Sequence, residues 1–163
     1  MGEEPRWLDR EEQRAWRAFL NANRLLFEVV DQQLQREAEI PHAYYEILVR
    51  LSEAPGRHLR MSDLASASKY SRSRLSHAVA RLEEQGWVRR DSCPTDRRGQ
   101  VAVLTDEGFA TLEAAAPGHV ECVRHALFDA LTPEQVRQLR EISEAIVRGL
   151  TATDAALVHE SRP

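Results

Sequence analysis

The chain has 163 residues, of which 42% are hydrophobic, and this length and composition favour one compact domain over residues 1–163. Its formal net charge of −4 at pH 7 argues against non-specific binding to nucleic acid. Two cysteines are too few for a disulfide scaffold, and no repeated CxxC spacing indicates a zinc site. No apolar run approaches the roughly 18 residues of a membrane helix, and no basic-then-apolar signal begins the chain. We therefore expect a cytoplasmic protein without a membrane partner.

The first predicted element is an unusually long helix over residues 7–40. Asp9 and Glu12 have the spacing of a capping box, in which each side chain accepts from the backbone amide of the other residue. Mostly apolar positions recur along the helix at steps of three and four residues: Trp16, Phe19, Asn23, Leu26, Val30 and Leu34. Pro41 follows Ile40 and is expected to stop the helix, and a shorter helix follows over residues 42–52.

Two further helices separated by a tight connector come next. The first is predicted over residues 61–67 with Ser62 as its N-cap, and the connector occupies residues 68–70. The second is predicted over residues 71–86. This is the spacing of a helix-turn-helix, in which the second helix enters the major groove of duplex DNA.

The helix over residues 71–86 has capping residues at both ends and two chemically different faces. The Ser71 hydroxyl is suited to accept from a free amide of the first turn, and Gly86 is suited to the positive φ that follows a helix. Its apolar face consists of Leu75, Ala78, Val79 and Leu82. The residues expected to contact DNA are Ser71, Arg72, Ser73, Arg74, Ser76, His77 and Arg81, since arginine pairs with guanine and serine with several base edges. An ordinary amphipathic surface helix with solvated arginines remains an alternative.

A β-hairpin is predicted after this helix. Residues 87–91 and 101–104 have strand-like sequences, and Pro94 and Gly99 punctuate the loop between them. The order helix, turn, helix, hairpin defines a winged helix, so the expected fold class is mainly α with a small β-hairpin. Ten Lys or Arg and five Asp or Glu give residues 57–98 a net charge of +5, which leaves −9 on the remainder. This basic cluster is typical of a DNA-binding module.

The C-terminal part is predicted to form two more helices and a tail over residues 151–163. The last helix opens at Thr132, with Pro133 at its first position and Gln135 closing a capping box. Its apolar positions are Val136, Leu139, Ile142, Ile146 and Leu150. A small winged helix cannot bury the apolar stripes of long helices at both ends of the chain, which favours an intertwined homodimer. A monomeric bundle that packs its own ends is the alternative.

These segments together resemble the multiple antibiotic resistance regulator (MarR) family over about residues 9–150. The matching segments are Leu64-Ala65, the helix over residues 71–86 with Arg81-Leu82-Glu83, Val88-Arg89-Arg90, Asp96-Arg97-Arg98-Gly99 and Leu104-Thr105-Asp106-Glu107-Gly108. The resemblance implies a homodimeric winged helix-turn-helix transcription factor, usually a repressor, that binds a near-palindromic double-stranded operator and is often released by a small phenolic or anionic ligand. It also implies dimerisation helices over residues 7–40 and 105–150 and a DNA-binding lobe over residues 41–104.

The resemblance assigns individual roles in the recognition helix and the wing. Residues 71–81 match the recognition helix. Asp96 and Arg98 match a wing pair in which the aspartate orients the arginine for the minor groove. Arg97 matches no fixed role, and we assign it to a phosphate contact.

Candidate ligand-binding residues follow from the resemblance as well. In the family, the pocket lies between the dimer helices and the DNA-binding lobe. The residues that we expect there are Trp16, His42, Tyr44, Tyr45, Arg60 and Asp63. Core aromatics and a surface pair of Arg60 with Asp63 are an equally good interpretation, and no residue indicates a cofactor or identifies the ligand.

Other functions are less well supported. Peroxide-sensing members of the family carry a reactive cysteine in the first helix, and residues 7–39 contain none. Oxidation of Cys93, or metal binding by the helically spaced His119, Cys122 and His125, would instead make a redox- or metal-responsive regulator of the same fold. A winged helix that binds protein rather than DNA is a second alternative. We expect no enzyme, because the sequence has no glycine-rich phosphate loop, Ser/His/Asp arrangement or H-E-x-x-H motif.

Overall fold

The computed structural model describes residues 4–93 and 96–160, without the side chains of residues 93, 96–98 and 153–160. Most of this part of the chain is helical, and its strands form one small sheet. The expected fold class, mainly α with a winged helix-turn-helix, is confirmed. None of the helices in the described residues is both long and apolar enough to cross a membrane.

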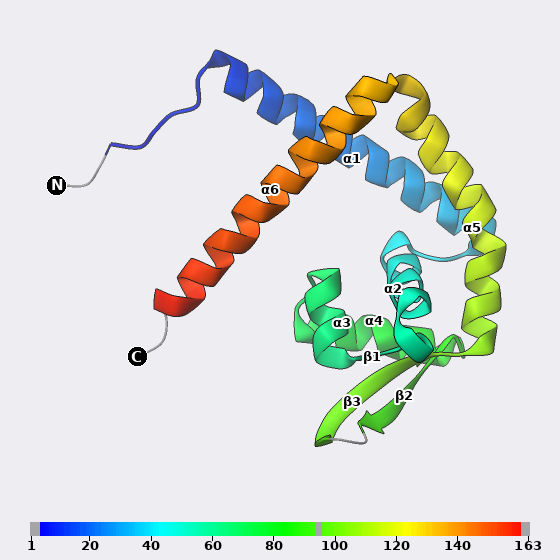
Figure 1. Ribbon diagram of the computed structural model, residues 1–163. Coiled ribbons are helices and arrows are strands. Elements are labelled where there is room, and N and C mark those ends of the chain that lie inside the picture. The colour runs from blue at the N-terminus through cyan, green and yellow to red at the C-terminus, as the bar shows by residue number, and fades with distance from the viewer. Residues whose placement is uncertain (1–3, 94–95, 161–163) are drawn as a thin grey trace. The chain divides into compact units, whose positions relative to one another are not determined.

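The chain divides into two units, residues 1–122 and residues 123–163. In chain order the elements are α1 (Arg10–Ala38), α2 (His42–Glu53), η1 (Pro55–Arg57), β1 (His58–Arg60), α3 (Met61–Ser68), α4 (Arg72–Glu84), β2 (Val88–Cys93), β3 (Asp96–Leu104), α5 (Asp106–Ala126), η2 (Phe128–Ala130) and α6 (Pro133–Glu160) (Figure 1). The first unit contains the sheet and the helix-turn-helix.

Helix α1 begins where the sequence predicts. The Asp9 carboxylate accepts from the Glu12 backbone amide and the Glu12 carboxylate accepts from the Asp9 amide, both at 2.8 Å. The predicted capping box is therefore confirmed. The helix ends because Glu39 adopts a left-handed conformation with φ 56°, just before the predicted stop at Pro41.

Helices α3 and α4 form the predicted helix-turn-helix. Lys69 follows α3 in a left-handed conformation with φ 55° and redirects the chain. The Ser71 hydroxyl accepts from the Arg74 amide at 3.2 Å and caps α4. Gly86 follows α4 with φ 76°, a conformation that glycine adopts without steric cost. Both predicted capping residues of the second helix are confirmed.

The prediction that Ser62 caps α3 is wrong. The N-cap is Arg60, which makes no side-chain capping bond, and the Ser62 hydroxyl donates to Asp63 Oδ1 at 3.2 Å. The reason is that strand β1 ends at Arg60, so the chain passes directly from sheet pairing into the helix.

The three strands form one antiparallel sheet in the order β1-β3-β2. Ala102 of the central strand pairs with Leu59 on one side and with Arg90 on the other. The sequence does not predict β1, because three residues with a single apolar position, Leu59, are too short to establish a strand periodicity. The hairpin is also longer than predicted, since Ser92 still pairs with Gln100 in the expected loop. Backbone hydrogen bonds sustain a ladder even where the side chains are polar.

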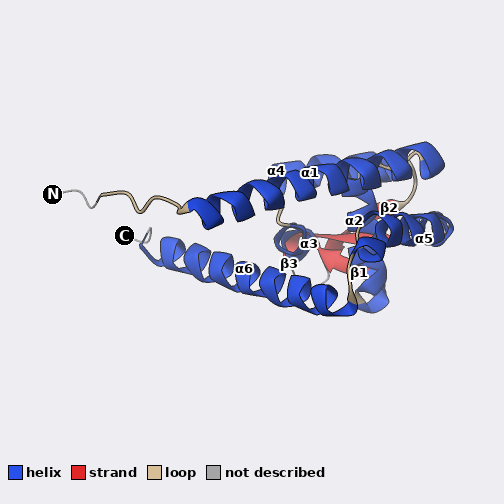
Figure 2. Cartoon of the chain, turned by 90° about the horizontal axis from the view of Figure 1, so that it is seen from above, coloured by secondary structure: helices blue, strands red, loops and turns tan. Residues whose placement is uncertain are grey.

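The core of the first unit lies between the sheet and helices α2, α3 and α4, which surround the strands in Figure 2. Its largest fully buried side chains are Leu34, Ile40, Ile47, Leu48, Leu51, Leu64, Leu75, Leu82 and Val79. Members of this set come from all three helices and from the C-terminal end of α1. Burial of one side of α4 leaves its other side facing solvent.

The start of α5 is joined to the turn that follows α4. The Thr105 amide donates to the Trp87 carbonyl at 3.0 Å, and the Thr105 hydroxyl donates to the Gly86 carbonyl at 2.7 Å. The same hydroxyl accepts from the Gly108 amide at 2.9 Å. Gly108 is buried here. These bonds fix the ends of α4, β3 and α5 against one another.

Helix α6 of the second unit begins as predicted and extends further than predicted. The Gln135 side chain accepts from the Thr132 amide at 2.9 Å, and the Thr132 hydroxyl accepts from the Gln135 amide at 3.3 Å, which confirms the capping box. The helix continues to Glu160 and so includes most of the expected tail over residues 151–163.

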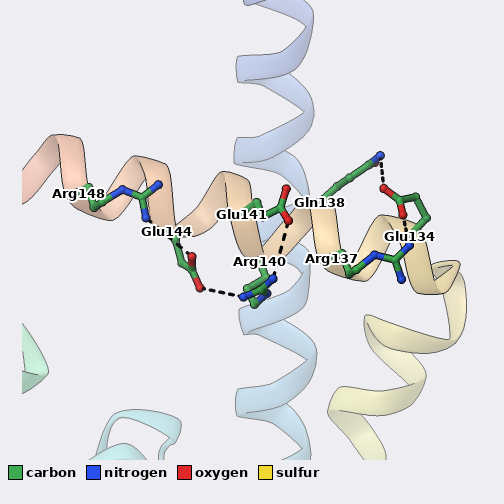
Figure 3. A network of polar contacts seen from close by, with 7 residues as sticks. All are labelled: Glu134, Arg137, Gln138, Arg140, Glu141, Glu144 and Arg148. Atoms are coloured by element: carbon green, nitrogen blue, oxygen red, sulfur yellow. Dashed lines mark hydrogen bonds and ion pairs between the residues drawn. The ribbon is translucent and has the colours of Figure 1, made fainter.

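One side of α6 is covered by polar, mostly charged side chains that contact one another. They are drawn in Figure 3: Glu134, Arg137, Gln138, Arg140, Glu141, Glu144 and Arg148. Large apolar side chains of the same helix are exposed: Leu139, Ile142, Ile146, Val147 and Leu150. Exposure of an apolar stripe on an amphipathic helix indicates a surface that another element covers.

Helix α1 has an apolar surface of the same kind. Only the C-terminal part of its stripe is buried, at Val30 and Leu34. The exposed apolar side chains are Trp16, Phe19, Leu20, Leu25, Phe27 and Val29. The rings of Trp16 and Phe19 stack with their centroids 6.4 Å apart.

Candidate nucleic-acid interface

The outer face of helix α4 presents polar and basic side chains to solvent. All the contacts predicted from this helix are exposed, namely Ser71, Arg72, Ser73, Arg74, Ser76, His77 and Arg81. The opposite face is buried through Leu75, Ala78, Val79 and Leu82. The structure thus brings the predicted helix residues together on one accessible surface.

Arg74 is held by an aromatic ring that the sequence analysis did not assign. The guanidinium carbon of Arg74 lies 4.3 Å from the centroid of the Tyr70 ring, a cation–π contact. Burial raises the pKa of the Tyr70 hydroxyl, and the Glu46 carboxylate raises it further. Tyr70 stands four positions before Arg74, but it belongs to the connector, where helical spacing does not predict a contact.

The other cations on this face differ in how they are held. Arg81 donates to the Glu84 carboxylate at 2.7 Å, and this hydrogen bond raises the pKa of Arg81. Within the described part of the chain, the side chains of Arg72 and His77 make no hydrogen bond or ion pair. The N-terminal half of α4 therefore carries the donors that are most accessible to a ligand.

A second residue missed by the sequence analysis is Arg90, on strand β2. Its Nη2 donates to the Ser76 carbonyl at 2.7 Å, and its Nε lies 3.3 Å from Glu83 Oε2. The backbone amide of Arg90 donates to Glu83 Oε1 at 2.9 Å. A sequence pattern does not reveal these contacts, because they depend on how β2 turns back beneath α4.

The predicted wing residues Asp96, Arg97 and Arg98 lie at the start of strand β3. Asp96 is paired with Cys93 in the backbone register of the hairpin. The side chains of all three predicted residues lie outside the described residues. The orienting role of Asp96, the minor-groove role of Arg98 and the phosphate contact of Arg97 stay predictions.

The predicted ligand-binding residues are distributed over more than one hollow. His42 and Tyr45 line a hollow of about 280 Å³, whose other walls are Glu46, Val49, Arg50, Glu53 and His119. Tyr44 lines a different hollow of about 310 Å³ with Arg81. Successive residues of a helix point about 100° apart, which separates the two tyrosines. Trp16, Arg60 and Asp63 line neither of these hollows.

The hollow beside His42 contains aromatic rings and buried polar atoms. The His119 ring lies 4.4 Å from the Tyr45 ring and 6.0 Å from the His42 ring, measured between centroids. Burial lowers the pKa of His119, and His42 lowers it further, which favours the neutral form of the His119 ring. Burial raises the pKa of Tyr45. Among the described residues, His119 Nδ1 and Arg50 Nε are buried without a hydrogen-bond partner.

The cysteine and histidine candidates are not gathered into a site in the described residues. No group of three or more His, Cys, Asp or Glu side chains there is arranged to hold a metal ion. Cys122 is a half-buried free thiol, and His125 lies 3.9 Å from the Asp129 carboxylate. The side chain of Cys93 lies outside the part of the chain that is described.

Known proteins share this architecture and are similar to this chain in sequence. A model of the MarR family matches residues 39–99. The structure of Sco3205 in complex with DNA, a MarR family transcriptional regulator from Streptomyces coelicolor, is 57% identical with a TM-score of 0.87, covering 91% of this chain and 93% of that chain. The structure of AbsC, a MarR family transcriptional regulator from the same organism, is 44% identical with a TM-score of 0.86, covering 91% of this chain and 99% of that one.

A curated relative matches over a shorter region. The HTH-type transcriptional regulator PecS of Dickeya dadantii (strain 3937) is 36% identical over 81 residues, which are 50% of this chain. The match spans 48% of the length of PecS, about half of that protein. The identity with Sco3205 extends over nearly the whole of both chains, together with the fold. This chain belongs to the MarR family of transcriptional regulators.

Proposed function

We propose that this protein is a sequence-specific transcriptional regulator that binds double-stranded DNA with α4 as its recognition helix in the major groove. The observation that carries the proposal is the exposed row of Ser71, Arg72, Ser73, Arg74, Ser76 and His77 on a helix whose other face is fixed in the core. Arginine, serine and histidine side chains on such a helix can donate to base edges. The first-turn amides of α4 also favour a phosphate.

The charge distribution supports the same function. Residues 57–98 carry a net charge of +5, although the whole chain carries −4. Clustered positive charge steers a protein to the phosphate backbone even when its overall charge is negative. The relative Sco3205, whose structure contains DNA, has the same fold at 57% identity. The wing residues Asp96, Arg97 and Arg98 belong to this proposal as minor-groove and phosphate contacts.

A homodimer is the second part of the proposal. Helices α1 and α6 each leave a row of large apolar side chains exposed in the single chain. A second copy would cover both rows, and its two-fold symmetry would present two recognition helices to successive major grooves. We therefore expect half-sites whose centres are about 10–10.5 bp apart.

Repression that a small molecule relieves is the third part of the proposal. The hollow lined by His42, Tyr45 and His119 supports it, because it combines aromatic rings with polar and charged side chains. A ligand with an aromatic ring would stack against Tyr45 in this hollow, and its polar groups would face the charged side chains of Glu46, Arg50 and Glu53.

Selection of DNA from a random duplex library by the full-length protein tests the proposal. In fluorescence-anisotropy titrations, we expect the selected duplex to bind at least about 1,000-fold more tightly than a scrambled duplex of the same composition. Affinity for both duplexes should fall as salt rises, because phosphate contacts release counterions. Failure to bind any duplex even at low salt would contradict the proposal and favour a winged helix that binds protein.

A further inference from the structure

We propose that Arg90 is a positioning residue that holds the recognition helix at a fixed angle to the wing, an inference that rests on the proposed function. Arg90 belongs to β2, the first strand of the wing hairpin, and not to the outer face of α4. Its side chain reaches α4 at two places seven residues apart, through a hydrogen bond to the Ser76 carbonyl and an ion pair with Glu83. One side chain thus connects the two elements that are expected to enter different grooves.

The contact with Ser76 is directed at the backbone. Arg90 Nη2 donates to the Ser76 carbonyl at 2.7 Å, in the middle of the helix. A helical carbonyl has a second lone pair, so it accepts this bond without losing its place in the helix ladder. The bond therefore fixes the helix axis, whatever side chain stands at position 76.

The contact with Glu83 fixes the other end of the helix. One carboxylate oxygen of Glu83 accepts from the Arg90 backbone amide at 2.9 Å, and the other lies 3.3 Å from Arg90 Nε. The Arg90 and Glu83 side chains are 23% and 32% exposed, less than those of any other Arg–Glu pair in the described residues. Charged contacts that are shielded from water keep their geometry better than exposed ones.

The arrangement needs arginine specifically. Its planar guanidinium donates to the Ser76 carbonyl through Nη2 while its Nε, which makes no hydrogen bond within the described residues, stays within ion-pair distance of the Glu83 carboxylate. Lysine carries the same charge on a single flexible ammonium group and cannot reproduce that fork. Replacing Arg90 by lysine therefore separates the effect of geometry from the effect of charge.

Neighbouring Arg89 provides a matched control. It stands next in the same strand and pairs with Asp91, which is also in β2, so it does not connect β2 to α4. Its side chain is 57% exposed. The variants to compare are Arg90→Lys, Arg90→Ala and Glu83→Gln, with Arg89→Ala as the control.

The first readout is discrimination between the selected duplex and a scrambled duplex. We expect Arg90→Lys and Arg90→Ala to weaken binding of the selected duplex by about tenfold, the equivalent of one lost charge-assisted hydrogen bond, and binding of the scrambled duplex by less than about twofold. Glu83→Gln should also lower discrimination, although it removes a negative charge from a DNA-binding lobe. Arg89→Ala should leave the ratio of the two affinities unchanged.

The second readout does not require DNA. Hydrogen exchange measured on the full-length protein should accelerate in residues 72–84 for Arg90→Ala and stay at the parent rate for Arg89→Ala. Because this measurement is independent of any duplex, it tests whether Arg90 positions α4 even if the protein selects no DNA. Parent-like exchange in Arg90→Ala would overturn the proposal.

Two binding results would also overturn it. Full recovery of discrimination in Arg90→Lys would mean that only the charge matters. Arg90→Ala could instead lose the same affinity for both duplexes, and the slope of log affinity against log salt concentration could fall by about 1. That result would identify Arg90 as a direct phosphate ligand. Failure of the proposed function itself would appear differently, as a parent protein that does not distinguish the two duplexes.

Discussion

Replacing Gly108 by alanine is expected to destabilise the folded protein by about 3 kcal/mol, the upper end for an overpacked site. A Cβ at this position would lie 2.1 Å from the Trp87 carbonyl oxygen and 2.9 Å from Leu104 Cδ1. The Trp87 carbonyl cannot move away freely, because it accepts from the Thr105 amide at 3.0 Å. The start of α5 would have to shift away from the hairpin. Urea denaturation of the parent and the variant measures the change in the free energy of unfolding.

Gly149 provides the control for this substitution. It lies inside α6, and nothing stands within 4 Å of a Cβ at this position. Gly149→Ala should therefore stabilise the protein by about 0.5–1 kcal/mol, because alanine favours a helix interior. If Gly108→Ala were as stable as the parent, this result would contradict the close packing of Gly108 against the Trp87 carbonyl.

Replacing Phe19 by glutamate is expected to raise the dissociation constant of the homodimer by at least about 100-fold. Phe19 stacks on Trp16 in the exposed stripe of α1, and 47% of its surface is accessible in the single chain. If a second copy covers this stripe, the variant buries a carboxylate without a partner, which costs several kcal/mol. Sedimentation velocity across a range of protein concentrations measures the shift from dimer to monomer.

Asn21→Glu introduces the same side chain two residues later. Position 21 is exposed and lies about 160° around α1 from Phe19, since successive helical residues are about 100° apart. Asn21→Glu should sediment like the parent. A stable monomer in the parent, or an equal effect of the two substitutions, would contradict the assignment of the stripe to the dimer.

Local features of this fold can be predicted from the sequence. The helix starts at Asp9, Ser71 and Thr132 depend on side chains that bond to amides within the next turn, so a spacing of three residues identifies them. The apolar face of α4 follows from helical periodicity for the same reason. The predicted contact face of α4 is exposed because it is the complement of that buried face.

Features that depend on contacts between residues far apart in the chain cannot be predicted from local sequence patterns. Strand β1 exists because Leu59 pairs with Ala102, more than forty residues later. Arg90 reaches Ser76 across a turn, and the sequence shows it only as one of several arginines near the hairpin. Among the predicted ligand-binding residues, Tyr44 and Tyr45 are adjacent in the chain but line different hollows. Tertiary packing decides each of these.

The central claim is that the outer face of α4 recognises base pairs, and the affinity of Arg74→Ala for single-base-pair variants of the selected duplex tests it most directly. The parent should lose about 1–3 kcal/mol of binding free energy when the base pair contacted by Arg74 is changed. Arg74→Ala should bind the selected duplex more weakly by a similar amount and should no longer discriminate at that base pair, while it still discriminates at the others. Equal losses of affinity for the selected and scrambled duplexes, with discrimination unchanged at every base pair, would contradict the claim.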